Sequence, residues 1–274
     1  MDLSSSWKGC EYGMDRWAIV TGASSGIGRE IALELDRRGY CLLLVARRED
    51  RLRALQKELR QPSDALVLDI RSVEACRRLY AYSQDRNVEI LVNNAGFGSI
   101  SAFLEDELER DIAMIQTNII ALHTLCKLYL RDFCAKDRGW ILNVASMASF
   151  APAGPYMAVY YASKAYVGSL SAALVREMKD QGSRVYLGAL HPGPVPTEFG
   201  SVARSGREAG SLPSLGSISA QRCARIAVDK MFVGKHLILP GFWMKLLYAA
   251  NKLLPRRLLT AVIARIQKAK TKPS

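Results

Sequence analysis

A tyrosine and a lysine lie one helical turn apart in the middle of the chain. Tyr160 and Lys164 have the four-residue spacing that places two side chains on one face of a helix. A phenol with an unperturbed pKa of about 10 is a weak acid at neutral pH, but a nearby positive charge favours phenolate and lowers that pKa. The pair is therefore a candidate proton donor. A Tyr-x-x-x-Lys spacing alone usually means two solvated side chains, so its meaning depends on the elements that position it.

Upstream, the sequence predicts a strand, a tight turn and a helix. Residues 17–21 are an apolar run, glycines follow at positions 22, 26 and 28, and an amphipathic stretch runs from Arg29 to Arg38. Each glycine removes a side chain where backbone must approach something closely, and the helix start offers N–H groups to a diphosphate. The Gly-x-x-x-Gly-x-Gly spacing differs from the commoner Gly-x-Gly-x-x-Gly. A sharp turn uses glycine without any ligand as well, so both interpretations stay open here.

Two further apolar runs end in polar residues. Residues 90–96 run from Ile-Leu-Val into Asn-Asn-Ala-Gly, and residues 140–146 run from Trp-Ile-Leu into Asn-Val-Ala-Ser. Both place polar groups at the carboxyl end of a predicted strand. In an open parallel sheet that edge is where ligands bind.

Taken together and in order, these segments resemble the short-chain dehydrogenase/reductase family over about residues 15–240. The matching segments are residues 21–28 (Thr-Gly-Ala-Ser-Ser-Gly-Ile-Gly), Asp69 after the third strand, residues 93–96 (Asn-Asn-Ala-Gly), Asn118, Ser146, Tyr160 with Lys164, and residues 192–197 (Pro-Gly-Pro-Val-Pro-Thr). Within the family, the chain is most similar to bacterial reductases of the ketoacyl-reductase type, many of which lack an assigned substrate.

Length and composition suit one such domain. A chain of 274 residues with 49% apolar content can form a single α/β unit with a large core, and no repeat or low-complexity linker divides it. Short apolar runs at residues 41–46 and 185–190 are typical of parallel strands buried on both faces. We therefore predict a flexible extension at residues 1–14, a doubly wound parallel Rossmann-like sheet with helices on both faces at residues 15–240, and a basic helical extension at residues 241–274.

The resemblance implies a cofactor site at the carboxyl edge of this sheet. The implied cofactor-binding residues are Gly22, Ser24, Ser25, Gly26, Ile27, Gly28, Arg47, Arg48, Asp69, Asn94, Ala95, Gly96, Tyr160, Lys164, Pro192, Gly193, Val195 and Thr197. In the family, the residue matching Asp69 lies near the adenine amino group, although an Asp after a strand is often a helix cap. Val195 and Thr197 would flank the nicotinamide carboxamide through a backbone group and a hydroxyl.

The end of the second strand bears on the choice between NAD and NADP. An acidic residue there would hydrogen-bond the ribose hydroxyls and repel a 2′-phosphate, but the chain has Ala46-Arg47-Arg48. Guanidinium groups bind phosphate through charge-assisted, bidentate hydrogen bonds. We therefore predict NADP(H) in preference to NAD(H), with Arg47 as the first choice for the phosphate contact and Arg48 as the bystander. The alternative is that both arginines decorate the exposed start of the next helix.

The resemblance also assigns catalytic roles. Ser146 would donate a hydrogen bond to the substrate carbonyl, Tyr160 would deliver the proton, and Lys164 would bind the nicotinamide ribose and depress the tyrosine pKa. Asn118 falls in a predicted helix, where asparagine is a poor helix former; in the family it holds a water that links the lysine to solvent. The alternative for Asn118 is an exposed side chain with a small cost in stability.

One departure from the family concerns the spacing before the tyrosine. Ser146 precedes Tyr160 by 14 residues, where the family usually has about 13. The loop of residues 150–155 can absorb an extra residue, so Ser146 is kept and Ser149 is the fallback. Tyr161 is excluded as the acid because Ala165, not lysine, lies one turn further on.

Two loops follow the tyrosine helix. Residues 192–197 are too proline-rich to extend a strand, so a rigid loop is predicted. Residues 200–219 are rich in Gly and Ser and lack helical periodicity, which indicates a substrate lid or a plain surface loop. Aromatic and sulfur side chains that are candidates to line an apolar pocket, or to be structural, are Phe150, Tyr156, Met157, Phe199 and Trp243.

Cysteine usage and the N-terminus indicate a cytoplasmic protein. Six cysteines form no Cys-x-x-Cys pair and are expected to be free thiols in a reducing compartment. Residues 1–13 are polar, so we expect neither a signal peptide nor a membrane anchor there. His123, His191 and His236 are too few and scattered to predict a metal site, and ordinary packing or surface roles are expected.

Much of the net charge of +12 lies in residues 241–274, which hold eight basic residues and no acidic one. Apolar residues follow helical spacing on both sides of Pro255, which predicts two amphipathic basic helices that are too short and too charged to span a bilayer. They can cover the core or substrate pocket of their own subunit, pack on another subunit, or lie on an anionic membrane surface; packing on protein is favoured. Nucleic-acid binding is not expected, because no reading motif or aromatic platform accompanies the charge.

The leading functional hypothesis is an NADPH-dependent reductase that acts on a small-molecule ketone or aldehyde, lipid-like or ketoacyl compounds included. The alternatives are an NADP(H)-binding sensor or scaffold with little turnover and an alcohol dehydrogenase that works in oxidation. We also expect a homo-oligomer, either a dimer or a tetramer.

Overall fold

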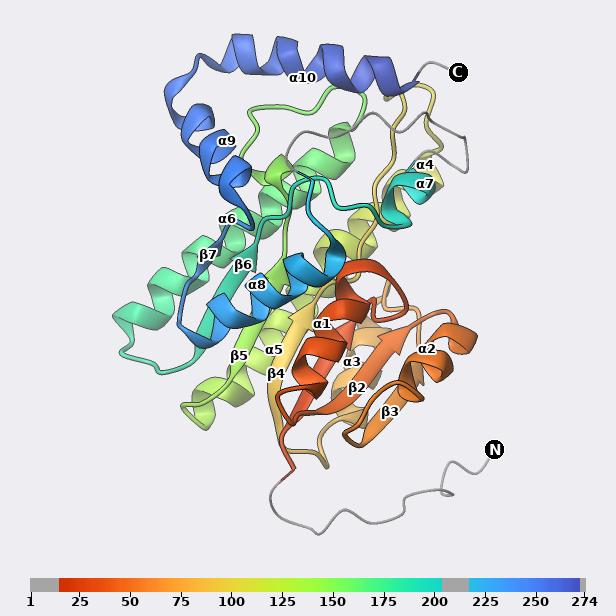
Figure 1. Cartoon of the computed structure of the whole chain (residues 1–274), viewed down its shortest axis with the longest axis vertical. Coiled ribbons are helices and arrows are strands. Elements are labelled where there is room, and N and C mark those ends of the chain that lie inside the picture. The colour runs from red at the N-terminus through yellow and green to blue at the C-terminus, as the bar shows by residue number, and fades with distance from the viewer. Residues whose placement is uncertain (1–14, 204–216, 272–274) are drawn as a thin grey trace.

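The structure, a computed structural model, describes residues 15–203 and 217–271. A parallel sheet of seven strands, in the order β3-β2-β1-β4-β5-β6-β7, forms its centre (Figure 1). The strands are β1 (Trp17–Thr21), β2 (Cys41–Ala46), β3 (Ser63–Val67), β4 (Val88–Asn93), β5 (Trp140–Val144), β6 (Tyr186–Leu190) and β7 (Leu237–Ile238). The order reverses between β1 and β4, and in doubly wound folds ligands bind outside the carboxyl ends of the strands at such a point.

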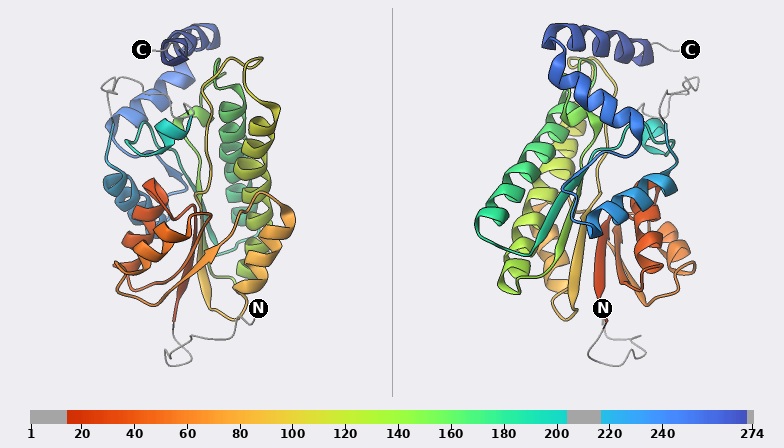
Figure 2. Two further views of the ribbon diagram at one scale, coloured as in Figure 1. Left: turned by 90° about the vertical axis from the view of Figure 1, so that its right-hand side faces the viewer. Right: turned by 60° about the vertical axis from the view of Figure 1, so that its left-hand side comes forward.

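Helices cover both faces of the sheet (Figure 2). One face carries α1 (Gly26–Asp36), α2 (Glu49–Gln56) and α8 (Ala220–Phe232), and the other carries α3 (Val73–Tyr82), α5 (Leu122–Ala135) and α6 (Ala158–Asp180). The predicted doubly wound architecture is confirmed.

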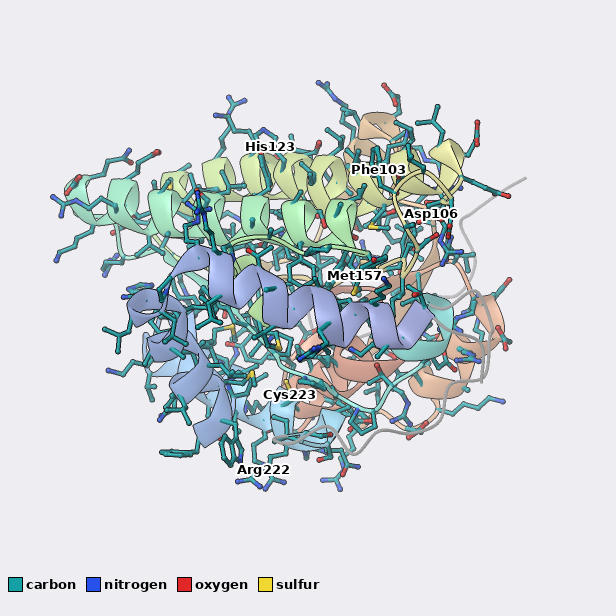
Figure 3. The ribbon with its side chains drawn as sticks, turned by 90° about the horizontal axis from the view of Figure 1, so that it is seen from above. Phe103, Asp106, His123, Met157, Arg222 and Cys223 are labelled. Carbon is teal, nitrogen blue, oxygen red and sulfur yellow. The ribbon has the colours of Figure 1, made fainter. Side chains whose placement is uncertain are left out.

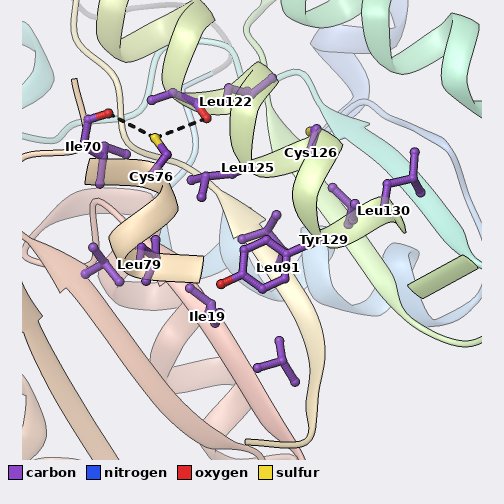
Figure 4. Packing of buried hydrophobic residues seen from close by; sticks show 14 of the residues in the cluster. Ile19, Ile70, Cys76, Leu79, Leu91, Leu122, Leu125, Cys126, Tyr129 and Leu130 are labelled. Carbon is purple, nitrogen blue, oxygen red and sulfur yellow. Dashed lines mark hydrogen bonds between the residues drawn. The ribbon is translucent and has the colours of Figure 1, made fainter. Parts of the chain in front are cut away.

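The central strands are buried along almost their whole length and are largely apolar, because helices cover both of their faces. Ile19 of β1 points into the cluster formed with α3 and α5, where Leu125 and Tyr129 pack (Figure 4). Its neighbour Ala18 points the opposite way, into the cluster that contains Ile31 of α1. Burial of one such leucine or isoleucine contributes roughly 1.5–3 kcal/mol to folding, and the alternation fixes the register of the sheet.

The helix before β5 changes its winding in the middle. It runs as α4 (Leu108–Ile115), a π-helical segment η1 (Gln116–Ala121) and then α5. A π-helical turn inserts one residue and rotates the side chains that follow, and such turns occur frequently at functional sites. The sequence predicts a helix here but not this change of winding.

Four shorter or later elements lie at the carboxyl edge of the sheet: η2 (Met147–Ser149), α7 (Phe199–Ala203), α9 (Phe242–Leu253) and α10 (Arg256–Thr271). The two helices predicted around Pro255 are confirmed, and α10 crosses this end of the molecule (Figures 1 and 3). No helix among residues 15–203 and 217–271 is long and apolar enough to cross a membrane. Residues 200–203 of the predicted irregular lid belong to α7; residues 204–216 and the predicted N-terminal extension lie outside the described residues.

Candidate active site

The glycine-rich turn between β1 and α1 is shaped by close backbone contacts. Gly22 and Gly26 have φ angles of 67° and 57°, which side-chain-bearing residues rarely adopt. A Cβ atom on Gly28 would lie 2.2 Å from Asn94 Nδ2 and 2.5 Å from the carbonyl oxygen of Gly22. The turn therefore requires glycine at these positions for steric reasons alone.

Asn94 joins the ends of β1 and β4. Its backbone N–H donates to Thr21 Oγ1 at 3.0 Å, and its side-chain amide donates to the carbonyl oxygens of Thr21 (3.0 Å) and Gly22 (3.2 Å). These hydrogen bonds hold the turn open at the point where the two loops diverge. In this structure, the Asn94 side chain therefore contacts the glycine-rich turn.

Arg48, at the end of β2, contacts the turn directly. Its Nη2 atom donates to Ser25 Oγ at 2.9 Å and to Ser24 Oγ at 3.1 Å. Arg47 is exposed, and its charge contributes to a lowered pKa of Asp69. The Arg48 side chain thus turns back over the glycine-rich turn, whereas Arg47, the first choice for the phosphate contact, is exposed.

A cleft of about 420 Å³ lies beside the turn. It is lined by the start of α1, by α2 and by residues 196–198. The carboxylate of Glu198 accepts a hydrogen bond from Arg48 at 2.8 Å and another from Arg51, and these two bonds lower the pKa of Glu198. No side chain caps α1, whose N-cap Ser25 Oγ accepts from Arg48 instead. Free N–H groups with adjacent guanidinium groups fit an anionic nucleotide.

Asp69 follows β3 and is held by Arg71. Its carboxylate accepts from the backbone N–H of Arg71 at 3.2 Å and from Arg71 Nε at 2.8 Å. Burial raises the pKa of Asp69, and the arginine hydrogen bonds lower it further than burial raises it. Asp69 is not the N-cap of α3, because Ser72 holds that position and accepts from the N–H of Ala75.

Tyr160 and Ser146 meet at the carboxyl edge of the sheet. Tyr160 is on the first turn of α6, Ser146 follows β5, and the Ser146 hydroxyl acts on the Tyr160 phenol by lowering its pKa. Ser149, the fallback, instead forms hydrogen bonds with the Ser146 carbonyl oxygen (2.6 Å) and with His191 Nδ1 (2.7 Å). In the loop between Ser146 and Tyr160, Tyr156 lies in the left-handed region at φ 63°.

Lys164 lies one turn beyond the tyrosine and is buried. Its Nζ atom donates to the carbonyl oxygen of Val144 at 2.8 Å. A Cβ atom on Gly96 would lie 3.4 Å from this Nζ and 2.8 Å from Asn118 Oδ1. Gly96 therefore leaves the space that brings lysine, asparagine and the loop after β4 together.

Asn118 is fully buried within the π-helical segment. Its Oδ1 accepts from the N–H of Phe97 (3.1 Å), and its Nδ2 donates to the Phe97 carbonyl oxygen (2.9 Å) and to Ser163 Oγ (2.9 Å). The exposed alternative is wrong. Because the π-turn directs the amide inward, Asn118 fixes the loop after β4 beside α6.

Burial controls the ionisation of this group. It raises the pKa of Tyr160 to about 12, against the hydrogen bond from Ser146, which lowers it. It also lowers the pKa of Lys164 to about 8. The expectation of a lowered pKa for Tyr160 is wrong for this structure. Removal from water destabilises the phenolate by more than the neighbouring groups stabilise it. Tyr160 is consequently a neutral phenol at pH 7.

The loop after β6 packs against the turn and against α9. Thr197 lies near Gly26, where an added Cβ would meet the threonine methyl group at 3.2 Å. Gly193 faces Met244 of α9, whose sulfur would be 2.6 Å from an added Cβ. Val195 packs on the buried cluster of β1 and α8. Pro192 accepts from the N–H of Met147 at 2.9 Å through its carbonyl oxygen, which ties the loop to η2.

Four of the five side chains predicted near the pocket divide into two groups. Phe199 lies 5.3 Å from the Tyr160 ring, centre to centre, and Met157 belongs to the same buried cluster. Phe150 instead stacks on His191, and Trp243 is 44% exposed. Figure 3 shows Met157 beneath α10. Only the first group contacts the tyrosine.

His191 is the site-adjacent residue that the sequence interpretation missed. It is buried behind Ser146, pairs with Ser149 and stacks on Phe150 at 4.3 Å. Burial lowers the pKa of His191 to about 4, with a contribution from the charge of Lys164. Its position directly after β6, at the carboxyl edge of the sheet, is the sequence feature that could have identified it as a residue near the site.

The fold and this edge define a nicotinamide-dependent oxidoreductase. The sequence model of the family described as short chain dehydrogenase matches residues 16–208, and the chain belongs to this family. The predicted resemblance is confirmed.

Two curated relatives illustrate the range of the family. Hydroxysteroid dehydrogenase-like protein 1 of Gallus gallus is 31% identical over 235 residues, covering 83% of this chain and 68% of that protein. A very-long-chain 3-oxoacyl-CoA reductase of Ajellomyces capsulatus is 34% identical over 184 residues, covering 64% of this chain and 54% of that protein. The chain thus matches little more than half of the length of the fungal relative.

Among solved structures, a short-chain dehydrogenase from Sphingobium yanoikuyae in complex with NADPH is 27% identical with a TM-score of 0.75. The match covers 95% of this chain and 96% of that one. The agreement over nearly the whole chain confirms the fold.

Proposed function

We propose that the protein is an NADP(H)-dependent reductase of a ketone or aldehyde, with Tyr160 as the proton donor. The observation that carries the proposal is the placement of Tyr160 next to Ser146, whose hydroxyl lowers the pKa of the phenol, beside buried Lys164. A phenol with a pKa of about 12 keeps its proton at pH 7 and can transfer it to an oxygen that becomes strongly basic during reduction.

Each residue then has one task. Ser146 donates a hydrogen bond to the substrate oxygen, and Tyr160 gives that oxygen its proton. The nicotinamide cofactor supplies the hydride when bound. Lys164, which remains largely charged below its pKa of about 8, stabilises the phenolate that the transfer leaves behind. Asn118 holds the relay that returns a proton to this group from solvent.

The cofactor would be held by three loops at the carboxyl edge: residues 22–28, residues 94–96 and residues 192–197. Arg47 and Arg48 follow β2 directly, beside the first loop, and the first carboxylate after the strand is that of Glu49 at the start of α2. Their charge supports NADP(H) in preference to NAD(H). Exposed Arg47 is available to a 2′-phosphate, and Arg48 becomes available when it exchanges its bond to Glu198 for one to the phosphate. Asp69 would lie near the adenine end of the cofactor, as the family resemblance implies.

The substrate is a small carbonyl compound, and an acyl or other lipid-like chain is the favoured class. The name of the fungal relative, a very-long-chain 3-oxoacyl-CoA reductase, supports this choice. Apolar Phe199 and Met157 beside the tyrosine suit such a chain. Oxidation of the corresponding alcohol uses the same groups in reverse, so a dehydrogenase working in oxidation is the alternative.

We also propose a homo-oligomer. Leu108 and Ile112 of α4 and Ile120 of η1 are large apolar side chains that are 67%, 44% and 38% exposed. Three exposed apolar side chains on one continuous helical segment indicate a surface that contacts another subunit. Light scattering coupled to size exclusion, on the parent and on Leu108→Glu, tests this point.

Absorbance at the reduced-nicotinamide band, with NADPH and NADH against ketones, aldehydes and ketoacyl thioesters, tests the function. Tyr160→Phe is expected to lose nearly all turnover while it still binds NADPH. Tyr161→Phe removes the adjacent phenol and is the matched control, expected to retain turnover. Comparable turnover in Tyr160→Phe, or no turnover of any carbonyl by the parent with either cofactor, contradicts the proposal. NADPH binding without turnover supports the sensor alternative.

A further inference from the structure

Exposed apolar side chains are concentrated on α9 and the short connection after it. Six of them are at least 37% exposed: Phe242, Trp243, Leu246, Leu247, Leu253 and Leu254. On α10, Leu258, Val262 and Ile266 are 53%, 49% and 51% exposed. Their four-residue spacing places these last three in one stripe along the helix. Together these residues form what we call the outer C-terminal face.

The outer C-terminal face accounts for nine of the eighteen large apolar side chains that are exposed among the described residues. A patch of this kind on a protein usually marks a contact with another molecule or with a membrane. Although these side chains are exposed, α9 and α10 are packed on the domain through their opposite sides.

Three contacts attach the inner sides of α9 and α10 to the catalytic edge. Met244 packs on Gly193, Tyr248 packs edge-on against Phe150 with ring centres 4.6 Å apart, and Gln267 Nε2 donates to Tyr161 Oη at 3.1 Å. Each helix therefore has one side fixed on the protein and an apolar side directed outward. Figures 1 and 2 show the two helices at the end of the molecule beyond the strands' carboxyl ends.

The charge around this face has one sign. Residues 241–274 contain no Asp or Glu. The exposed basic residues on the two helices and their connection are Lys245, Lys252, Arg256, Arg257, Arg265 and Lys268. Arg265 adjoins the apolar stripe of α10, one residue before Ile266 and three after Val262. An apolar stripe edged by Lys and Arg is the pattern of a helix that lies in the interface of an anionic bilayer.

A second copy of the chain fits this face less well. A two-fold interface brings the same patch of both subunits together, so it would bring two basic surfaces together without an acidic partner on either helix. An anionic lipid surface offers an apolar interior to the exposed apolar side chains and negative charge to the basic side chains. Phe242 and Trp243 at the start of α9 suit the headgroup level, where aromatic side chains are enriched.

We propose that the outer C-terminal face of α9 and α10 binds the surface of an anionic lipid bilayer and holds the catalytic edge toward it. The helices lie along the surface without crossing it. The placement of the catalytic edge also gives a lipid-like carbonyl compound a short route to Tyr160, and this last consequence rests on the proposed function.

Flotation of the full chain with vesicles tests the proposal. Vesicles of phosphatidylcholine with phosphatidylglycerol are expected to carry the protein upward, and vesicles of phosphatidylcholine alone are expected to carry much less. Raising the salt concentration should weaken binding, because exposed charges are screened. Val262→Glu is expected to reduce the bound fraction about tenfold, since a carboxylate would enter an apolar, anionic interface. Val233→Glu makes the same change at a valine that is 65% exposed after α8 and is the matched control.

A second variant tests the proposal independently, in case Val262→Glu does not fold. Arg265→Glu reverses one charge beside the stripe without altering an apolar side chain, and reduced binding with unchanged circular dichroism supports the proposal. No flotation of the parent with anionic vesicles at low salt overturns it, as does equal loss of binding in Val233→Glu and Val262→Glu. Dissociation of a dimer by Val262→Glu without any vesicle binding assigns the face to a second copy instead. Tyr160→Phe should float like the parent, so failure of the proposed reductase activity is separable from failure of lipid binding.

Discussion

Arg48 Nη2 donates a hydrogen bond to Ser25 Oγ at 2.9 Å and so joins the end of β2 to the start of α1. The guanidinium group thereby lies beside the first N–H groups of a helix, where both partial and full positive charge favour an anion. Arg47, its neighbour, is exposed, and its charge makes a small contribution to the lowered pKa of Asp69.

The first prediction concerns cofactor choice. Arg48→Ala is expected to raise KM for NADPH about tenfold and to change KM for NADH much less, because one charge-assisted hydrogen bond contributes about 1.5 kcal/mol or more. Arg47→Ala is the neighbouring comparison and should have a smaller effect. Initial rates with each cofactor provide the measurement. Equal effects of Arg48→Ala on both cofactors, or a larger effect from Arg47→Ala, would contradict the assignment.

The second prediction concerns the pH profile. Lys164, with a pKa of about 8, loses its charge as the pH rises, whereas Tyr160, with a pKa of about 12, keeps its proton. The kcat/KM for carbonyl reduction should therefore be level near neutrality and should fall above about pH 8. Lys164→Arg retains a positive charge at every accessible pH, so its lower activity should no longer fall in this range. A level profile up to pH 9.5 in the parent would rule out this role of the lysine charge.

The third prediction separates two serines. Ser146 acts on the Tyr160 phenol and lowers its pKa, whereas Ser149 is hydrogen bonded with His191. Ser146→Ala is expected to lower kcat on the order of 100-fold, as loss of a donor to a developing oxyanion usually does. Ser149→Ala should stay within a few-fold of the parent. The reverse order of the two effects would make Ser149 the substrate-binding serine.

The parts of the site that local sequence predicts correctly are those that depend on spacing. Gly22 and Gly26 adopt the left-handed backbone expected of a tight turn, and Tyr160 and Lys164 lie on one helix at the spacing that a helix requires. The ends of the strands can also be predicted from the sequence, because strands buried on both faces are distinct apolar runs. The order of these segments then determines which loops meet at one edge.

The parts that the sequence did not predict depend on contacts between distant segments. The partners of Arg48 include Glu198, which is 150 residues away, and His191 became part of the site only when β6 paired with β5. The direction of the Tyr160 pKa shift depends on burial by side chains from several loops. The inward direction of Asn118 depends on a π-turn, which has no simple sequence signature.

The fourth prediction tests Asn118 as a structural clamp. Asn118→Ala removes three hydrogen bonds and leaves the N–H and carbonyl groups of Phe97 without this partner, so the free energy of unfolding should fall by about 2–4 kcal/mol. Urea unfolding measures the change. Thr117→Ala is the control on the same segment, because its hydroxyl bonds only to the carbonyl oxygen of Ala113 one turn earlier. An Asn118→Ala variant as stable as Thr117→Ala would show that the amide does not hold this loop.

The fifth prediction concerns acid stability. The pKa of His191 falls from 6.5 to about 4 because the ring is buried. Between these values the unfolded chain binds a proton that the folded protein does not, so stability is fully present above pH 6.5 and is lost as the pH falls toward 4. The shift corresponds to about 3 kcal/mol. His191→Gln should therefore lose less stability than the parent between pH 7.5 and pH 4.5 in urea titrations, whereas His123→Gln, on the exposed side of α5, should follow the parent. If both variants lose as much stability as the parent, protonation of other groups drives the acid transition, and the Ser149–His191 pair does not contribute to it.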